Sequence, residues 1–338
     1  MKRLIILLLV LATIACEMSA RDRINFDKGW RFALVDSVQM SSPEYDDAAW
    51  RLLNVPHDWA IEGDFSASAP SGNSGGALPG GIGWYRKTFN VDKADEGKQL
   101  YIDFDGVYMN AKVWINGTLL GQRPYGYSSY RYDLTPYIIY GGKNVVAVRV
   151  DNSDQPNSRW YSGCGIYRHV WLNKTHMVHV AHWGTHVVAE GNKVKVDVTV
   201  DNPDNAKFTV RNILLDRGGR AVGKSTGLKS VIKVGKPRLW SCESPYVYTV
   251  KTEILVGGNV VDTYTTTTGF RTFKFDAAKG FSLNGKSMKI NGVCQHHDLG
   301  CLGAALNEDA LHRQLRILKE MGVNAVRCSH NPPAPELL

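Results

Sequence analysis

Two stretches near the end of the sequence gather polar side chains of several types. The first, NGVCQHHD, and the second, VNAVRCSHN, each follow a short apolar run, and between them they supply Gln295, His296, His297 and Asp298, then Ser329, His330 and Asn331. Imidazole, amide, hydroxyl and carboxylate groups together offer both donors and acceptors of hydrogen bonds. This mixture favours a ligand that carries many hydroxyl groups.

Other chemistries need to be weighed against this one. His296, His297, Asp298 and His330 are all of types that ligate metals. Adjacent residues in an extended chain point to opposite sides, however, so His296 and His297 rarely share one ion. Cys328 and His330 lie on one face of a strand, but nothing in the sequence suggests an oxyanion hole for a thiol nucleophile. Polar residues that merely end their strands are the structural alternative.

A strand, a helix and a second strand must position these residues. The stretch NEDALHRQLRILKEMG predicts an amphipathic helix with Asn307 as its N-cap, and Gly322 ends it. Its apolar face carries Leu311, Leu315 and Leu318. The order strand–helix–strand predicts a parallel βαβ unit. In a (β/α)8 barrel the carboxyl ends of the strands form the active face, so both polar stretches would lie on one rim.

The earlier part of the chain predicts two β-sandwiches. Residues 22–175 hold many short alternating strands and suggest a jelly roll. Asn116-Gly117 in AKVWINGTLLG predicts a hairpin with a type I′ turn. Residues 176–272 form a second all-β block and suggest an Ig-like sandwich, and residues 273–338 begin the barrel. The Gly/Ser/Pro-rich stretch 64–83 predicts a long surface loop, either lining a site or merely mobile.

The composition and the first residues of the sequence limit the classes to which the protein can belong. The chain has 338 residues and a formal net charge of +8, but its basic residues are scattered, so we expect no nucleic-acid partner. Residues 1–20 match an export signal peptide. Cys16 after Ala15 makes it a candidate lipoprotein signal, and ordinary cleavage near Ala20 is the alternative. The other cysteines are expected to be free thiols, with a Cys294–Cys301 bridge as the alternative.

Many short motifs along the chain resemble glycoside hydrolase family 2, the group of β-galactosidases, β-glucuronidases and β-mannosidases. They occur in the family's order over nearly the whole mature chain: FDKGWRF, VPHDW, GWYRKTF, AKVWINGTLLG with PYGY, RWYSGCGIYRHVWL, PRLWSCESPYVYTV, GFRTFKFD, FSLNGKSMKINGV, HHDLGCLGAA and MGVNAVRCSHNPPAP. The resemblance implies a sugar-binding jelly roll, an Ig-like domain and a (β/α)8 catalytic barrel. The stretch from Asp216 to Pro237 is short for the family, which suggests that the middle sandwich lacks a strand or hairpin.

The resemblance also implies roles for individual residues. His296 and His330 match the family's histidines that contact the sugar at the ends of the first two barrel strands. Asp58 matches a polar residue that reaches from the jelly roll into the pocket, and Asn331 is also expected to bind the substrate. Arg327 is expected either to organise the strand ends or to form an ion pair below the barrel rim. Of the tryptophans, Trp160 is expected to border the barrel and to bind the substrate. Trp59 and Trp84 are expected in the sandwich core, with stacking on a sugar face as the alternative.

The catalytic carboxyl groups of the family are not expected in this sequence. A retaining glycosidase needs two carboxyl groups about 5–5.5 Å apart. From about Phe281 fewer than 60 residues remain, whereas a complete barrel takes about 250. Neither Glu320 nor Glu336 occupies a position that the family pattern supports, and Asp298 is expected in the wall of the subsite. The acid/base and nucleophile glutamates are therefore expected beyond Leu338, and the sequence is interpreted as the N-terminal part of the enzyme, inactive alone.

Together these observations predict an exported, retaining β-glycosidase, with β-galactosidase activity favoured and β-glucuronidase or β-mannosidase activity as alternatives. A non-catalytic glycan-binding lipoprotein is the alternative from another class. The expected ligand is a β-linked oligosaccharide or glycoside, and a homo-oligomer is a further expectation. No cofactor is expected in these residues, although the full-length enzyme could use Mg or Na. We expect the protein in the periplasm or anchored to the outer membrane of a Gram-negative bacterium.

Overall fold

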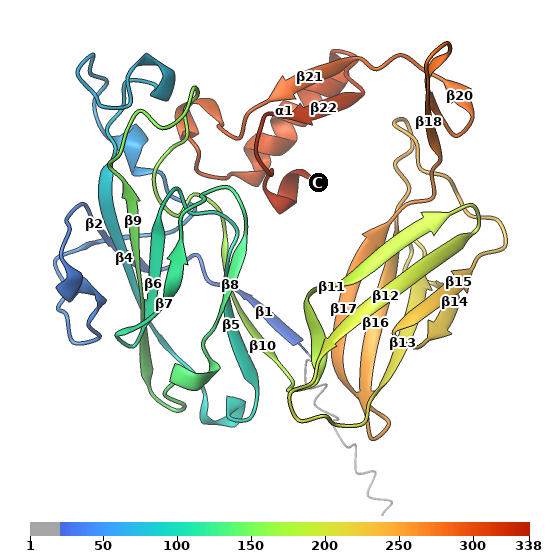
Figure 1. Ribbon diagram of the computed structural model, residues 1–338, viewed down its shortest axis with the longest axis horizontal. Coiled ribbons are helices and arrows are strands. Elements are labelled where there is room, and N and C mark those ends of the chain that lie inside the picture. Colours follow the sequence, from blue (N-terminus) through green and yellow to red (C-terminus); the bar gives the residue numbers. More distant parts are fainter. Residues whose placement is uncertain (1–20) are drawn as a thin grey trace, which may run out of the picture.

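The computed structural model describes residues 21–338. The expected signal peptide and Cys16 lie outside these residues. Two β-sandwiches stand side by side, and a small segment with the only α-helix of the described residues lies across one end of them (Figure 1). The predicted class, mostly β with a jelly roll, an Ig-like sandwich and the beginning of a barrel, is confirmed.

The first sandwich is built from a four-stranded and a six-stranded antiparallel sheet. The smaller sheet has the order β1-β10-β5-β8, with β1 Arg21–Asn25, β10 Val170–Thr175, β5 Gln99–Phe104 and β8 Tyr130–Asp133. The larger has the order β3-β2-β4-β9-β6-β7, with β3 Arg51–Leu53, β2 Trp30–Ala33, β4 Gly81–Asn90, β9 Lys143–Asn152, β6 Ala111–Ile115 and β7 Thr118–Arg123.

Alternation along these strands explains the core. In β9 the buried residues Val146, Val148 and Val150 are spaced by two, because successive side chains of a strand point to opposite faces. Trp59 and Trp84 are each only 1% exposed, so both belong to the core as expected. The turn between β6 and β7 has φ values of 47° at Asn116 and 82° at Gly117, which agrees with the predicted type I′ hairpin.

The Gly/Ser/Pro-rich loop is folded back onto the jelly roll. Ser71 and Leu78 are buried, and the Ser71 hydroxyl bonds both the carbonyl and the N–H of Leu78 at 2.8 and 3.1 Å. The last residues of the stretch already belong to β4.

The second sandwich packs a three-stranded sheet, β11-β12-β15, on a four-stranded sheet, β14-β13-β16-β17. Their bounds are β11 His179–Glu190, β12 Lys193–Asp201, β15 Lys229–Lys233, β14 Ala221–Thr226, β13 Thr209–Leu215, β16 Tyr248–Val256 and β17 Asn259–Thr268. The expectation that this domain lacks a strand or hairpin is wrong. The short stretch from Asp216 to Pro237 holds both β14 and β15, since Gly227 and Leu228 alone separate them.

The last segment begins with a small antiparallel sheet of β18 Phe273–Asp276, β19 Gly280–Leu283 and β20 Lys286–Ser287. It continues with β21 Gly292–Gln295, α1 Glu308–Glu320 and β22 Ala325–Cys328. β21 and β22 pair in parallel, with Gln295 opposite Cys328, which confirms the predicted βαβ unit. The Asn307 side chain accepts a hydrogen bond from the Ala310 N–H at 2.9 Å, so it is the N-cap as expected.

Polar contacts join the three parts. Arg21 on β1 forms an ion pair with Asp262 on β17 at 2.9 Å, and the Asp262 side chain is fully buried. The Lys319 amine on α1 donates to the Cys242 carbonyl at 2.7 Å, which ties the helix to the Ig-like domain. Of the described cysteines all five are free thiols, so the alternative of a Cys294–Cys301 bridge is wrong. Within residues 21–338, no helix has the length and apolar character needed to cross a membrane.

Candidate sugar-binding site

The two strand ends bring His296 and His330 together. Their ring centroids lie 5.8 Å apart with an interplanar angle of 69°. Trp160, from the loop that follows β9 in the jelly roll, completes the group: its ring lies 5.6 Å from His296, edge-on at 90°, and 5.3 Å from His330. The parallel pairing of β21 and β22 explains the placement, because residues that follow neighbouring parallel strands emerge side by side.

These three side chains border an open pocket of about 880 Å³ between the jelly roll and the barrel segment. The jelly roll contributes most of the remaining wall, which is rich in aromatic and amide side chains: Tyr108, Met109, Tyr125, Tyr127, Asn157, Ser158 and Arg159. Aromatic faces with a few donors and acceptors are the usual lining of a site for a small polar ligand. Of this wall, the sequence pointed to His296, His330, Asn331 and Trp160, whereas the remaining jelly-roll residues were not expected from it.

Asn331 also lines the pocket, and Arg327 lies behind it. The side-chain amide oxygen of Asn331 accepts a hydrogen bond from the Tyr125 hydroxyl at 2.8 Å, which links the barrel rim to the jelly roll. Arg327 is exposed, and its guanidinium donates to the Ser329 hydroxyl at 3.0 Å. Arg327 therefore contacts the turn that carries His330, as expected of an organising residue, and it forms none of the ion pairs seen in residues 21–338.

The turn that carries His330 and Asn331 is fastened from below by Arg168. This arginine is buried, and its guanidinium donates to the carbonyl oxygens of Pro332 at 2.9 Å and Pro333 at 3.3 Å. The same guanidinium donates to the Tyr127 carbonyl of the jelly roll at 3.0 Å. Through Arg168, the jelly roll thus fixes the position of the second strand end beside the pocket.

His297 points away from the pocket, as alternation predicted for the neighbour of His296. Its Nε2 lies 3.2 Å from the Ser162 carbonyl, and its ring packs edge-on against Tyr127 at 5.1 Å and Tyr167 at 5.7 Å. Burial lowers the pKa of His297 to about 4, so the imidazole is neutral and donates to that carbonyl. His297 therefore holds the first strand end against the jelly roll.

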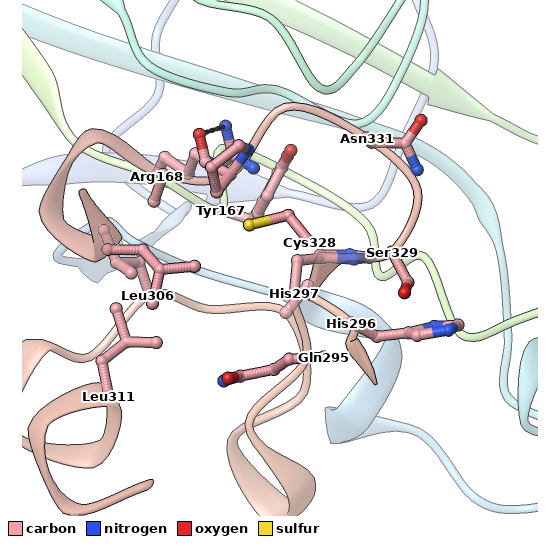
Figure 2. Close-up of a pocket in the computed structure, with 14 residues that line it drawn as sticks. Tyr167, Arg168, Gln295, His296, His297, Leu306, Leu311, Cys328, Ser329 and Asn331 are labelled. Carbon is pink, nitrogen blue, oxygen red and sulfur yellow. Dashed lines mark hydrogen bonds between the residues drawn. The ribbon is translucent and has the colours of Figure 1, made fainter. Parts of the chain in front are cut away.

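A small cavity of about 30 Å³, large enough for one water molecule, lies behind the histidines. Figure 2 shows its wall, with Leu306 and Leu311 on one side and Cys328 and Asn331 on another. A cavity of this size cannot hold a sugar, so the larger open pocket is the candidate site.

Asp58 is placed differently from what the sequence suggested. It is only 2% exposed and does not line the pocket. Its carboxylate accepts hydrogen bonds from the backbone N–H groups of Ala60, Cys164 and Ala304 and from the Tyr161 hydroxyl. Burial raises the pKa of Asp58, although these four donors oppose the shift. The expected reach into the pocket is thus corrected: the carboxylate joins the jelly roll to the loop after His297.

Asp298 is a second correction, since it does not line the open pocket either. Among the described residues, no group of three or more His, Cys, Asp or Glu side chains is placed to hold a metal ion. The magnesium or sodium that the resemblance suggested for the full-length enzyme has no such cluster in residues 21–338.

The carboxyl groups of Glu320 and Glu336 and the residues after Asn331 take no part in the wall of the open pocket. Glu320 ends α1, Glu336 lies in the turn after β22, and neither carboxyl group lines the open pocket. Leu338 is 94% exposed and also lies outside the pocket wall. The glutamates expected beyond Leu338 fall outside the described residues, so their existence stays a prediction.

Comparisons with known proteins now place this architecture in a family. Residues 25–176 match the family model for the sugar-binding domain of glycosyl hydrolases family 2. Residues 178–271 match the model described simply as glycosyl hydrolases family 2, and residues 276–338 match the model for the TIM barrel domain of the same family. The chain belongs to glycosyl hydrolase family 2.

Individual relatives make the likeness more specific. The chain is 55% identical to the β-galactosidase BoGH2A of Bacteroides ovatus over 95% of its length, and it spans 40% of that relative. It is 43% identical to a putative β-glucuronidase of Formosa agariphila, of which it spans 33%. Among solved structures, a β-glycosidase from Bacteroides vulgatus superposes with a TM-score of 0.90 at 42% identity, covering 94% of this chain and 42% of that one.

Proposed function

We propose that this chain forms the sugar-binding part of an exported, retaining β-glycosidase that removes terminal β-linked sugars, with β-galactosides as its first candidate substrates. The observation that carries the proposal is the meeting of His296, His330 and Trp160 around one open pocket. The 55% identity with a β-galactosidase supports the choice of galactose.

Each side chain has a role in this proposal. The imidazoles and the Asn331 amide exchange hydrogen bonds with sugar hydroxyls, and the indole of Trp160 packs against an apolar face of the ring. Two carboxyl groups of later barrel strands, beyond Leu338 and about 5–5.5 Å apart, would protonate the leaving oxygen and attack the anomeric carbon.

The test is a panel of aryl β-glycosides given to the full-length protein. We expect hydrolysis of the β-galactoside, and we expect His330→Ala to lower kcat/KM by about a hundredfold, since it removes a direct contact with the sugar. Residues 21–338 alone should show no turnover. Measurable hydrolysis by residues 21–338 that His330→Ala abolishes would overturn this division of labour.

β-Glucuronidase activity is the second candidate, because a 43% identical relative is a putative β-glucuronidase. The same panel separates the two activities by their kcat/KM ratio. Export and lipid attachment at Cys16 remain proposals, and metabolic labelling with a radioactive fatty acid, compared between the native protein and Cys16→Ala, tests the attachment.

A further inference from the structure

Among residues 21–338, the wall of the open pocket carries one formal charge, that of Arg159, and no carboxylate of these residues lines the pocket. Arg159 lines the pocket next to Trp160 and is exposed. Within residues 21–338 its guanidinium has no hydrogen bond, no ion pair and no aromatic ring beneath it. Other arginines of the same domain are paired with carboxylates, Arg131 with Asp103 at 2.6 Å and Arg149 with Asp36 at 2.8 Å.

The backbone around Arg159 is held on both sides. Before Arg159, the side-chain amide of Asn157 donates to the side-chain oxygen of Asn152 at 2.7 Å and to the Asp154 backbone carbonyl at 2.9 Å. After it, the Trp160 indole donates to the Tyr127 hydroxyl at 3.1 Å. The segment is therefore fixed while the guanidinium is left free, which is the arrangement expected of a group that binds a ligand.

The charge of the remaining wall is one-sided. Among the described residues, no aspartate or glutamate lines the pocket, and the other polar groups are neutral amides, hydroxyls and imidazoles. Neutral hydroxyl groups of a sugar can be met by those groups alone. A free guanidinium adds a planar fork that matches an oxyanion such as a carboxylate or a sulfate.

From this placement we propose that Arg159 is a specificity-determining residue that binds an anionic substituent, a carboxylate or a sulfate, on the sugar held against His296 and His330. The proposal rests on the assignment of the open pocket as the sugar subsite. It makes a β-uronide or a sulfated β-galactoside the preferred substrate, while the neutral β-galactoside of the proposed function is hydrolysed with a lower kcat/KM.

The experiment compares pairs of aryl glycosides that differ only in charge, using the full-length protein. One pair is β-glucuronide and β-glucoside, and the other is the 6-sulfated and the plain β-galactoside. We expect Arg159→Gln to lower kcat/KM for the anionic member of the preferred pair by about tenfold or more, chiefly through KM. The neutral member should change less than about twofold, and Arg159→Lys should recover part of the loss.

Arg217→Gln serves as the matched control, because Arg217 is an exposed arginine in a turn of the Ig-like domain, far along the chain from the pocket. The pair of aryl glycosides whose charged member loses kcat/KM in Arg159→Gln shows whether Arg159 binds a carboxylate or a sulfate. Equal losses on charged and neutral members, or no loss on either, would overturn the proposal, since Arg159 would then contact hydroxyl groups, serve the reaction itself or face away from the sugar.

A binding measurement separates this proposal from the proposed function. If the full-length protein hydrolyses no aryl glycoside, the proposed function fails. Calorimetric titration with glucuronate, galactose 6-sulfate and galactose still decides the role of Arg159: preference for an acidic sugar that Arg159→Gln removes supports it, and equal affinity for all three sugars overturns it.

Discussion

At the scale of single residues, the two kinds of tryptophan in this chain separate binding from folding. Trp84 is 1% exposed and stacks on Trp114 at 5.1 Å, whereas Trp160 borders the pocket and touches both histidines. Removal of a large aromatic side chain from a core leaves a cavity and destabilises the fold, whereas removal of one from a pocket wall mainly weakens ligand binding.

We therefore predict opposite effects for two substitutions. Trp84→Ala should lower the free energy of unfolding by about 3–5 kcal/mol, measured by urea denaturation. Trp160→Ala should change that free energy much less and should lower kcat/KM of the full-length protein by about tenfold. A Trp160→Ala protein with unaltered kinetics would remove Trp160 from the site.

Asp58 carries a second prediction at this scale. The carboxylate accepts from four donors, and an amide in its place turns an N–H₂ group toward some of them. Asp58→Asn should thus lower the free energy of unfolding by about 2–3 kcal/mol. Asp204→Asn is the control, since Asp204 is exposed. Equal denaturation midpoints of the two variants would contradict the linking role of Asp58.

At the scale of elements, one histidine holds the N-terminus of α1 and the tail after β22 on the jelly roll. His169 Nδ1 lies 2.7 Å from Asp27, and its Nε2 lies 3.5 Å from Glu308 in the first turn of α1. Burial alone would lower the pKa of His169, but the hydrogen bond and charge of Asp27, with the charges of Glu336 and Glu308, raise it above 6.5. A positive imidazole facing these carboxylates stabilises the docked helix.

The pH dependence follows from the direction of that shift. Because the pKa of folded His169 is higher than that of the unfolded chain, its contribution is complete below pH 6.5 and is lost as the pH rises through the folded value. We predict faster hydrogen exchange in α1 at about pH 8.5 than at about pH 6, after correction for the intrinsic rate. His169→Gln should abolish the difference and His312→Gln, on the exposed side of α1, should keep it.

The β6–β7 hairpin allows a test of turn chemistry. Gly117 has a φ of 82°, and a Cβ added there would meet the Pro43 side chain at 3.1 Å. Gly117→Ala should therefore lower the free energy of unfolding by about 1–2 kcal/mol, seen as a lower thermal midpoint. Gly235→Ala is the control, because its φ is not positive and no atom lies within 4 Å of an added Cβ. Similar midpoints would indicate that the turn relaxes.

At the scale of the whole molecule, the two sandwiches are complete and the barrel segment is not covered. Buried residues such as Val146, Val148 and Ile254 are fully inaccessible within the sandwiches, whereas no residue of β18 to β22 is buried. An uncovered parallel pair lacks the apolar burial that stabilises such sheets. Polar contacts from Arg168, Asp58 and Lys319 hold the segment to the sandwiches, and Ala304 packs in a small apolar cluster with three tyrosines of the jelly roll.

We predict that, when residues 21–338 are produced alone, backbone amides of β21 and β22 exchange with solvent much faster than those of β4 and β9. The reason is that local opening of β21 and β22 exposes little additional apolar surface. Hydrogen exchange followed by mass spectrometry measures the difference. Equal protection of the two pairs of strands would show that the segment is stable without further covering.

The sequence alone determined the class of each domain, the type I′ turn at Asn116-Gly117, the cap of α1 and the two strand ends that bear His296 and His330. These features depend on local preferences and on the periods of apolar residues, which any short window of sequence displays. Two predictions from the sequence were wrong. Asp58 was expected in the pocket, but an aspartate is equally suited to a buried site where it accepts hydrogen bonds. A strand or hairpin was expected to be missing between Asp216 and Pro237, because the turns between the strands there are short.

Only the tertiary structure decided which jelly-roll residues meet the barrel rim. The pocket wall joins residues near 108, 125 and 159 with residues near 296 and 330, and no local pattern carries such distant contacts. It also decided that four donors enclose the Asp58 carboxylate, while no acceptor within residues 21–338 meets the Arg159 guanidinium. Burial and partnership are properties of the packed chain, since they depend on which distant surfaces exclude water from a side chain.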